Sequence, residues 1–198
     1  MKTKPNLAFH FVGDTLRDGS PIPPDGKWLT FKGKCVMCES GLHASRNPFD
    51  ALQYAPGNTL CLVEVDGIEA EEDEKLVCRR RKIIARMDAT ELCSYFGRMR
   101  ALSVIHLWDA PDVVLDYLMT GDEVIRQAAR DAANAAYSSY AAKYARAAQG
   151  AAYAAMDAAR SAWAAVVAID NVWGEGDSRA AAKNEFTQLV YECFEGYL

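Results

Sequence analysis

At 198 residues, of which 51% are hydrophobic, the chain is long enough to bury a sizeable core. Its 22 Lys and Arg stand against 27 Asp and Glu, which gives a formal charge of -5. This acidic surplus argues against sequence-independent nucleic-acid binding, because that activity needs clustered cations. An acidic face that docks on a basic partner remains open.

The chain start, MKTKPNLAFHFV, has no apolar run followed by a small-residue cleavage site. The longest apolar run elsewhere, Trp163–Ile169, is far shorter than a membrane span. We therefore expect a cytosolic protein that does not enter a membrane. Its six cysteines are then expected to be reduced thiols and not a disulfide framework.

The first part of the chain has the pattern of β-strands. Short apolar or alternating runs are separated by the turn clusters DGSPIPPDG and APGN. The predicted strands are Leu7–Val12, Trp28–Phe31, Thr59–Val65 and Leu76–Ile84, and GLHAS is predicted as a further strand. One helix interrupts them, because Ser45 or Asn47 can cap a helix that Pro48 opens.

Near Asp88 the apolar period changes from two to three or four, which predicts successive helices to the C-terminus. About half of residues 128–168 are alanine, the residue with the highest helix propensity. Gly121 is expected to end one of the helices, and Gly150 to mark either a kink or a hairpin. Ser178 is expected to cap the last helix.

These patterns predict an α+β protein. A small, mostly antiparallel β domain with one helix is expected over residues 1–87, followed by an Ala-rich helical domain over residues 88–198.

Cys35 and Cys38 form a C-x-x-C motif, which as a zinc half-site needs a second pair of ligands. The remaining cysteines and histidines are single residues, and the motif does not open a helix that would activate a thiol. We therefore predict no metal and no cofactor, and assign both cysteines a structural role. Cys38 and Leu42 are expected to lie buried in a strand-helix-strand unit.

The charge blocks EAEEDE and CRRRK lie on either side of a possible turn. Pairing between the blocks across a hairpin is the preferred interpretation. The alternative is that Arg79, Arg80 and Arg81 form a basic patch for a phosphate or an acidic partner. The candidate binding residues are these three arginines, His43 and Ser45 at the strand-to-helix junction, and Glu71, Glu72 and Asp73.

One arrangement points to an enzyme. A strand histidine, His10, precedes the GLHAS strand, and Tyr54 is expected on the helix that follows. This order resembles the ADP-ribosyltransferase superfamily, which implies that His10 and Tyr54 would hold a nicotinamide dinucleotide. That family also uses a glutamate on a late strand, whereas Glu64, the strand carboxylate of interest here, comes earlier in chain order.

The whole chain resembles a family of uncharacterised phage and prophage proteins. The residues that carry the resemblance are Cys38 with GLHAS, DALQYAPG, LCLVEVDG, EDEKLVCRRRKII, DATELC, IHLWDAPDVVLDYLMTGD and the Ala-rich tail. The resemblance implies a phage-encoded accessory protein with a β-rich first part and a helical second part.

Three functions follow as hypotheses. The leading one is a protein that binds and inhibits a host defence complex by occlusion, as an anti-CRISPR or related counter-defence protein, without catalysis. The second is an ADP-ribosyltransferase-like enzyme that modifies a host target. The third is a structural or oligomerising phage protein. The sequence names no partner and does not set the oligomeric state.

Overall fold

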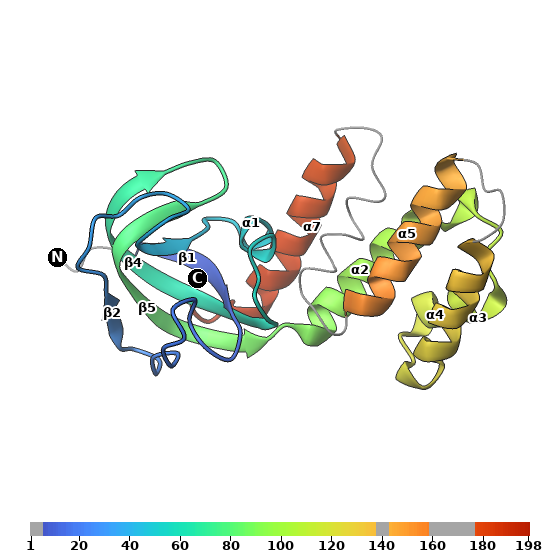
Figure 1. Cartoon of the computed structure of the whole chain (residues 1–198), viewed down its shortest axis with the longest axis horizontal. Coiled ribbons are helices and arrows are strands. Elements are labelled where there is room, and N and C mark those ends of the chain that lie inside the picture. Colours follow the sequence, from blue (N-terminus) through green and yellow to red (C-terminus); the bar gives the residue numbers. More distant parts are fainter. Residues whose placement is uncertain (1–5, 138–142, 159–176) are drawn as a thin grey trace. The chain divides into compact units, whose positions relative to one another are not determined.

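The structure is a computed structural model that describes residues 6–137, 143–158 and 177–198. The chain forms two compact units, the first made of Met1–Ala89 with Glu185–Leu198 and the second of Thr90–Asn184. The first unit holds all the strands of the described residues, and the second is helical (Figure 1). The predicted α+β class is therefore confirmed.

An antiparallel sheet organises the first unit. Its strands follow the order β1-β4-β5-β2, and β3 pairs separately with the start of β5. Their bounds are Leu7–Val12 for β1, Trp28–Thr30 for β2, Leu42–Ala44 for β3, Thr59–Glu71 for β4 and Leu76–Asp88 for β5. The strand predictions are confirmed in position, and β4 and β5 form one long hairpin (Figure 1).

The β4–β5 hairpin extends beyond the predicted ends of both strands. In β4, most residues beyond Val65 are exposed, so the hydrophobic alternation of this strand stops before the strand does. Opposite charges also face each other across the hairpin, in the register pairs Glu64 with Lys82 and Asp66 with Arg80. Cross-strand pairs of this kind stabilise a hairpin where apolar packing is missing.

One face of the sheet is covered by α1 (Pro48–Leu52) and by the end of α7 (Asp177–Cys193). The ring of Phe9 lies 6.0 Å from that of Tyr191 and 6.3 Å from that of Phe194. Phe49 of α1 meets Phe186 edge to face at 6.1 Å. Aromatic packing therefore ties the last turns of α7 to the sheet, although the sequence pattern had grouped this helix with the helical part.

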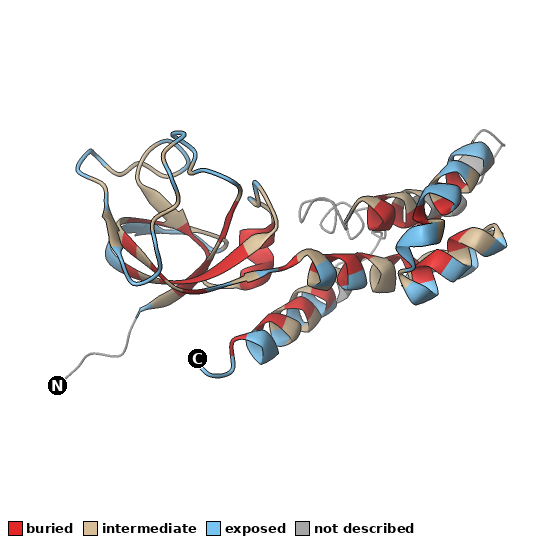
Figure 2. Cartoon of the chain, turned by 90° about the horizontal axis from the view of Figure 1, so that it is seen from below, coloured by how far each residue is buried: buried red, intermediate tan, exposed pale blue. Residues whose placement is uncertain are grey.

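The predicted helix start is also confirmed in detail. The Asn47 side chain accepts a hydrogen bond from the Phe49 N–H at 2.8 Å, so Asn47 is the cap of α1. Figure 2 shows the buried residues of this unit concentrated on the strands and α1, whereas the loops before β3 are mostly exposed.

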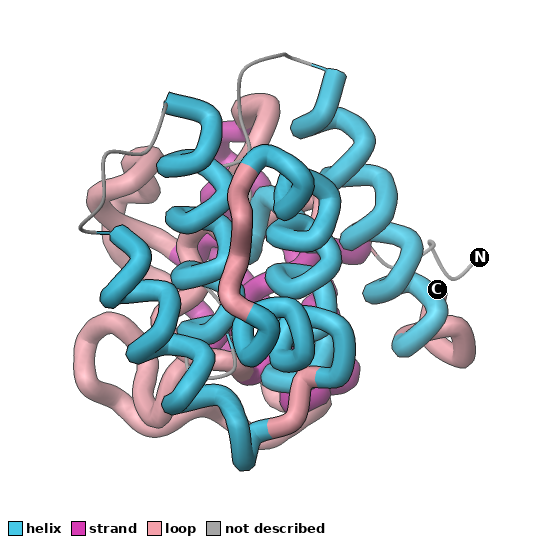
Figure 3. The backbone as a smooth tube through the Cα atoms, turned by 90° about the vertical axis from the view of Figure 1, so that its right-hand side faces the viewer, coloured by secondary structure: helices cyan, strands magenta, loops and turns pink. Residues whose placement is uncertain are grey.

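Helices make up the described part of the second unit, where they pack in pairs (Figure 3). They are α2 (Thr90–Val104), the short η1 (Ile105–Leu107), α3 (Asp112–Thr120), α4 (Glu123–Tyr137) and α5 (Lys143–Ala158). Gly121 ends α3 in the left-handed conformation, as predicted, and its N–H donates to the Tyr117 carbonyl at 2.7 Å. Helix α5 runs through Gly150 without a break.

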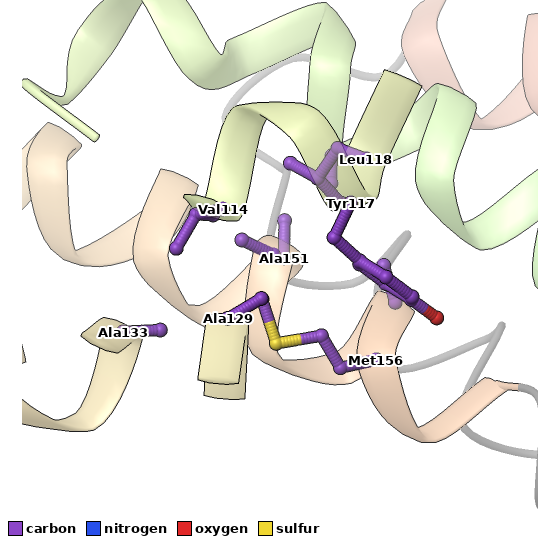
Figure 4. Close-up of a cluster of buried hydrophobic side chains, with 10 residues drawn as sticks. Val114, Tyr117, Leu118, Ala129, Ala133, Ala151 and Met156 are labelled. Carbon is purple, nitrogen blue, oxygen red and sulfur yellow. The ribbon is translucent and has the colours of Figure 1, made fainter. Parts of the chain in front are cut away.

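The core of the second unit combines a few large side chains with many alanines. Tyr117, Leu118 and Met156 are fully buried among alanines of α4 and α5 (Figure 4). Because an alanine side chain is a single methyl group, the helix backbones can approach closely around these anchors. Part of the Ala-rich segment, residues 138–142 and 159–168, lies outside the described residues.

Among the residues that the structure describes, no helix has the length and apolarity needed to cross a lipid bilayer.

Candidate functional site

Polar side chains gather around His43, at the point where β3 leads toward α1. The Cys38 backbone N–H donates to His43 Nε2 at 3.0 Å. The Cys38 carbonyl accepts a hydrogen bond from Arg17 Nη1 at 3.4 Å, and Lys75 Nζ lies 2.8 Å from Cys38 Sγ. We use the name β3 cluster for Arg17, Cys38, His43, Lys75 and the buried Arg81.

The prediction that Cys38 is buried is wrong, because its side chain is exposed. Its backbone has φ of +64°, a left-handed conformation that non-glycine residues rarely adopt. The tight turn from Val36 to Ser40 requires this conformation and directs the chain back toward β3. Leu42, which was also predicted to be buried, is only partly buried, although it packs against the buried core of the sheet.

Arg81 is the buried cation of the β3 cluster, with only 7% of its surface exposed. Its Nη1 donates to the His43 carbonyl. Among the described residues no carboxylate pairs with it, and burial lowers its pKa to about 10. The guanidinium therefore fixes the end of β3 from inside the fold.

His10 points to the same side of the sheet as this arginine. It lies directly opposite Cys61 on β4, and Val65 of β4 lies opposite Arg81, so alternation places all four on one face. Burial lowers the pKa of His10 well below 6.5, and the positive charge of Arg81 lowers it further. His10 is thus held as a neutral imidazole beside a buried cation.

The pKa of His43 is also lowered from its ordinary value. Its pKa is lowered by burial first, and then by the cations of Arg81, Arg17 and Lys75. The β3 cluster therefore concentrates positive charge around a neutral imidazole in an otherwise acidic protein.

Tyr54 lies at the edge of the β3 cluster. It follows α1 and is not part of that helix, which corrects its predicted position. Its ring centroid is 5.4 Å from Lys75 Nζ, and its hydroxyl is 3.4 Å from Glu74 Oε2. Tyr54 and His10 are thus linked only indirectly, through Lys75 and His43. No direct contact between His10 and Tyr54 is found among the described interactions.

Ser45, the other polar residue predicted at this junction, is buried. Its backbone pairs with Phe9 through two hydrogen bonds of 2.8 and 2.9 Å. This bridge joins the end of β3 to β1, so the backbone of Ser45 has an evident structural role.

The acidic and basic blocks pair across the β4–β5 hairpin, as the preferred interpretation predicted. Arg79 binds Glu69 at 2.6 Å, and Arg80 binds Asp66 at 3.0 Å. Because these two arginines are paired on the surface and Arg81 is buried, the three do not form a common basic patch.

Acidic residues dominate the exposed end of the hairpin. Glu71, Glu72 and Asp73 are all exposed at or beside the turn. Glu71 binds Arg46 through contacts of 2.8 and 3.1 Å, and Glu72 lies 3.8 Å from Lys75. Asp73 lies at the turn between the strands.

A hollow of about 480 Å³ lies on the same hairpin, away from its tip. Trp28 of β2, Glu64 and Asp66 of β4, and Asn6 before β1 contribute to its lining. The strand pattern had identified Trp28 only as the start of a strand. No local sequence signal identifies this hollow, because Trp28 lies 36 residues before Glu64 in the chain.

All six cysteines are free thiols. Within the described ranges, no group of three or more His, Cys, Asp or Glu side chains is arranged to hold a metal ion.

Comparison with known proteins adds one finding. Residues 6–95 match the model of a family described as a domain of unknown function, DUF7666. The match covers every strand and α1, and ends early in α2. A search of curated proteins and a search of solved structures each found no match.

Proposed function

We propose that the protein is a phage-encoded accessory protein of the host cytosol that binds a host defence complex and inhibits it by occlusion. The observation that carries the proposal is the acidic end of the β4–β5 hairpin, with Glu71, Glu72 and Asp73 exposed together. The resemblance to phage proteins supports the choice of partner.

The hairpin offers a basic surface a compact set of carboxylates. Seven of the eleven residues from 64 to 74 are Asp or Glu. Three of these carboxylates are held by ion pairs with arginines: Glu71 with Arg46, Glu69 with Arg79 and Asp66 with Arg80. They therefore lose little conformational freedom when a partner binds. A basic surface used to hold nucleic acid would be covered by such a hairpin, and the attraction would also speed association.

The test uses tagged full-length protein to capture a defence complex from host lysate, followed by an activity assay of the purified complex. Wild-type protein is expected to inhibit that activity stoichiometrically. The triple variant Glu71→Gln, Glu72→Gln, Asp73→Asn should lose inhibition. A control triple variant in α7 and just beyond its end, Glu185→Gln, Glu192→Gln, Glu195→Gln, removes the same charge elsewhere and should inhibit as wild type does.

Equal inhibition by both triple variants would contradict the acidic-hairpin mechanism. A concentration-dependent oligomer in analytical ultracentrifugation, without any inhibited complex, would favour the third hypothesis, an oligomerising phage protein.

The enzyme remains the second proposal, and one observation favours it. The β3 cluster combines cations with a neutral histidine: Lys75 lies next to Tyr54, and Arg81 and His43 act electrostatically on His10. This is a suitable setting for an anionic ligand such as a dinucleotide. The test is mass spectrometry of host proteins incubated with the protein and NAD. ADP-ribose on a target only with NAD, and not with His10→Ala plus Tyr54→Ala, would support the enzyme over the inhibitor.

A further inference from the structure

The hollow beside Trp28 has a chemical character that neither proposed function uses. It is lined by Asn6, by Trp28 of β2 and by residues 64–68 of β4, which include Glu64 and Asp66. Gly67 has φ of +65°, and the register of β4 against β5 shifts just beyond it, between Ile68 and Ala70. The volume of about 480 Å³ is large enough for a single large side chain and its water.

The carboxylates determine which ligands fit. Ionised Glu and Asp only accept hydrogen bonds, so a ligand must bring donors. Lys82 contacts Oε2 of Glu64 at 2.6 Å, and Arg80 contacts Oδ2 of Asp66 at 3.0 Å. Each carboxylate has a second oxygen, and the side chains of Glu64 and Asp66 keep 26% and 54% of their surface exposed.

Trp28 adds a planar aromatic ring that already lies next to two cations of this chain. Its ring centroid lies 4.4 Å from the Arg80 guanidinium carbon and 4.7 Å from Lys82 Nζ. A ring in this position interacts with cationic groups through its quadrupole. Among cations, a guanidinium is planar, stacks on aromatic rings and binds a carboxylate through two parallel bonds, whereas an ammonium does not.

The surface that continues from the hollow favours a protein ligand over a free small molecule. Glu69, Glu71, Glu72 and Asp73 extend the row of carboxylates along the hairpin from Glu64 and Asp66 to the tip. An extended basic segment could follow this row while one of its side chains enters the hollow.

We propose that the Trp28 hollow receives the guanidinium group of an arginine from a basic segment of the partner protein, held by Trp28, Glu64 and Asp66. This inference rests on the proposed docking of the acidic hairpin and names the chemistry of the partner at that surface. The incoming guanidinium competes with Arg80 and Lys82 for the carboxylates. The hollow alone therefore binds weakly, with a dissociation constant on the order of 1 mM, and the carboxylate row supplies the remaining affinity.

The test uses the full chain and two blocked peptides, acetyl-Gly-Arg-Gly-amide and its citrulline analogue, which has the same shape but no charge. NMR follows the indole N–H resonance of Trp28, assigned with Trp28→Phe. The arginine peptide is expected to shift this resonance saturably, and the citrulline peptide to leave it in place. Glu64→Gln and Asp66→Asn should each weaken binding about tenfold, the loss of one charge-assisted hydrogen bond.

Glu69→Gln is the matched control. Glu69 is also an exposed glutamate ion-paired at 2.6 Å on this hairpin, but it does not line the hollow. Wild-type affinity is expected for this variant. No saturable shift, an equal shift with citrulline, or an equal loss in Glu69→Gln would overturn the proposal.

The two proposals fail separately. If hairpin-dependent inhibition of a defence complex is found but the arginine peptide does not bind, only the assignment of the hollow is refuted. If the peptide binds as expected and no complex is inhibited, the hollow stands as an arginine site and the proposed counter-defence function is refuted.

Discussion

The neutral His10 predicts that the protein loses stability as the pH falls below about 6.5. Burial and the Arg81 cation hold the pKa of His10 well below 6.5 in the folded state. The unfolded chain has the ordinary value of about 6.5, so below this pH it binds a proton that the folded state does not bind. The free energy of unfolding therefore rises with pH in this window, and the contribution of His10 is fully present above it.

The size of this pH dependence follows from the one proton that His10 binds in the unfolded state only. While His10 is neutral in the folded state and protonated in the unfolded state, the free energy of unfolding falls by up to about 1.4 kcal/mol for each pH unit. His43, whose pKa is also lowered, adds to the slope in the same direction. The ionic pairs of Glu71 and other carboxylates weaken only at lower pH, near and below their ordinary pKa values.

The assay is urea unfolding followed by far-UV circular dichroism at pH 7.5, 6.5, 5.5 and 5.0. We expect the free energy of unfolding of the wild type to fall with acidification. His10→Gln should show a shallower dependence, with a difference approaching about 1.4 kcal/mol per pH unit. His106→Gln is the control, because His106 is exposed and outside the sheet, and it should keep the wild-type slope.

Equal slopes for the wild type and His10→Gln would refute the assignment of His10 as a neutral histidine in the folded state. Greater stability of the wild type at pH 5.5 than at pH 7.5 would refute the reasoning as a whole.

Three further predictions concern the first unit. Gly41→Ala should lower the melting temperature more than Gly19→Ala does. Both glycines have positive φ, but a Cβ at residue 41 would lie 2.5 Å from a valine methyl, whereas one at residue 19 would meet nothing within 4 Å. Equal losses in melting temperature would contradict the close contact at residue 41. Phe49→Ala should cost about 3 to 5 kcal/mol in urea unfolding, since the ring is fully buried, and a loss below about 1 kcal/mol would contradict its packing. Burial raises the pKa of Cys61 and Cys78 to about 11, so mass spectrometry should find both unmodified by iodoacetamide at pH 8 in the native protein and modified in urea; rapid native labelling of either would contradict it.

The strands and the cap of α1 could be predicted because they depend on local signals. Alternating apolar residues identified β1 at its observed bounds, and Asn47 followed by Pro48 identified the helix start. The end of β4 could not be predicted, because most residues beyond Val65 are exposed and the hydrophobic alternation stops there. The end of β5 was missed because its last residues pair with the start of β4, a long-range contact that no local pattern shows.

The candidate site was only partly predictable. His43 and Tyr54 were recognised as residues of interest, but their link depends on Lys75 and Arg17, which reach Cys38 from distant parts of the chain. The exposure of Cys38 could not be foreseen either, because its left-handed backbone conformation is a property of the turn and not of the residue type.

The return of the chain to the first unit at Glu185 affects how this unit folds during its synthesis. Because residues 90–184 intervene, strands β1 to β5 leave the ribosome well before the last turns of α7 that cover Phe9. At a usual rate of about 5 to 20 residues per second, the aromatic face of the sheet stays uncovered for several seconds or longer. During that interval the nascent protein is exposed to aggregation and to chaperone binding, so premature termination within the helical unit would release a product that cannot complete its core.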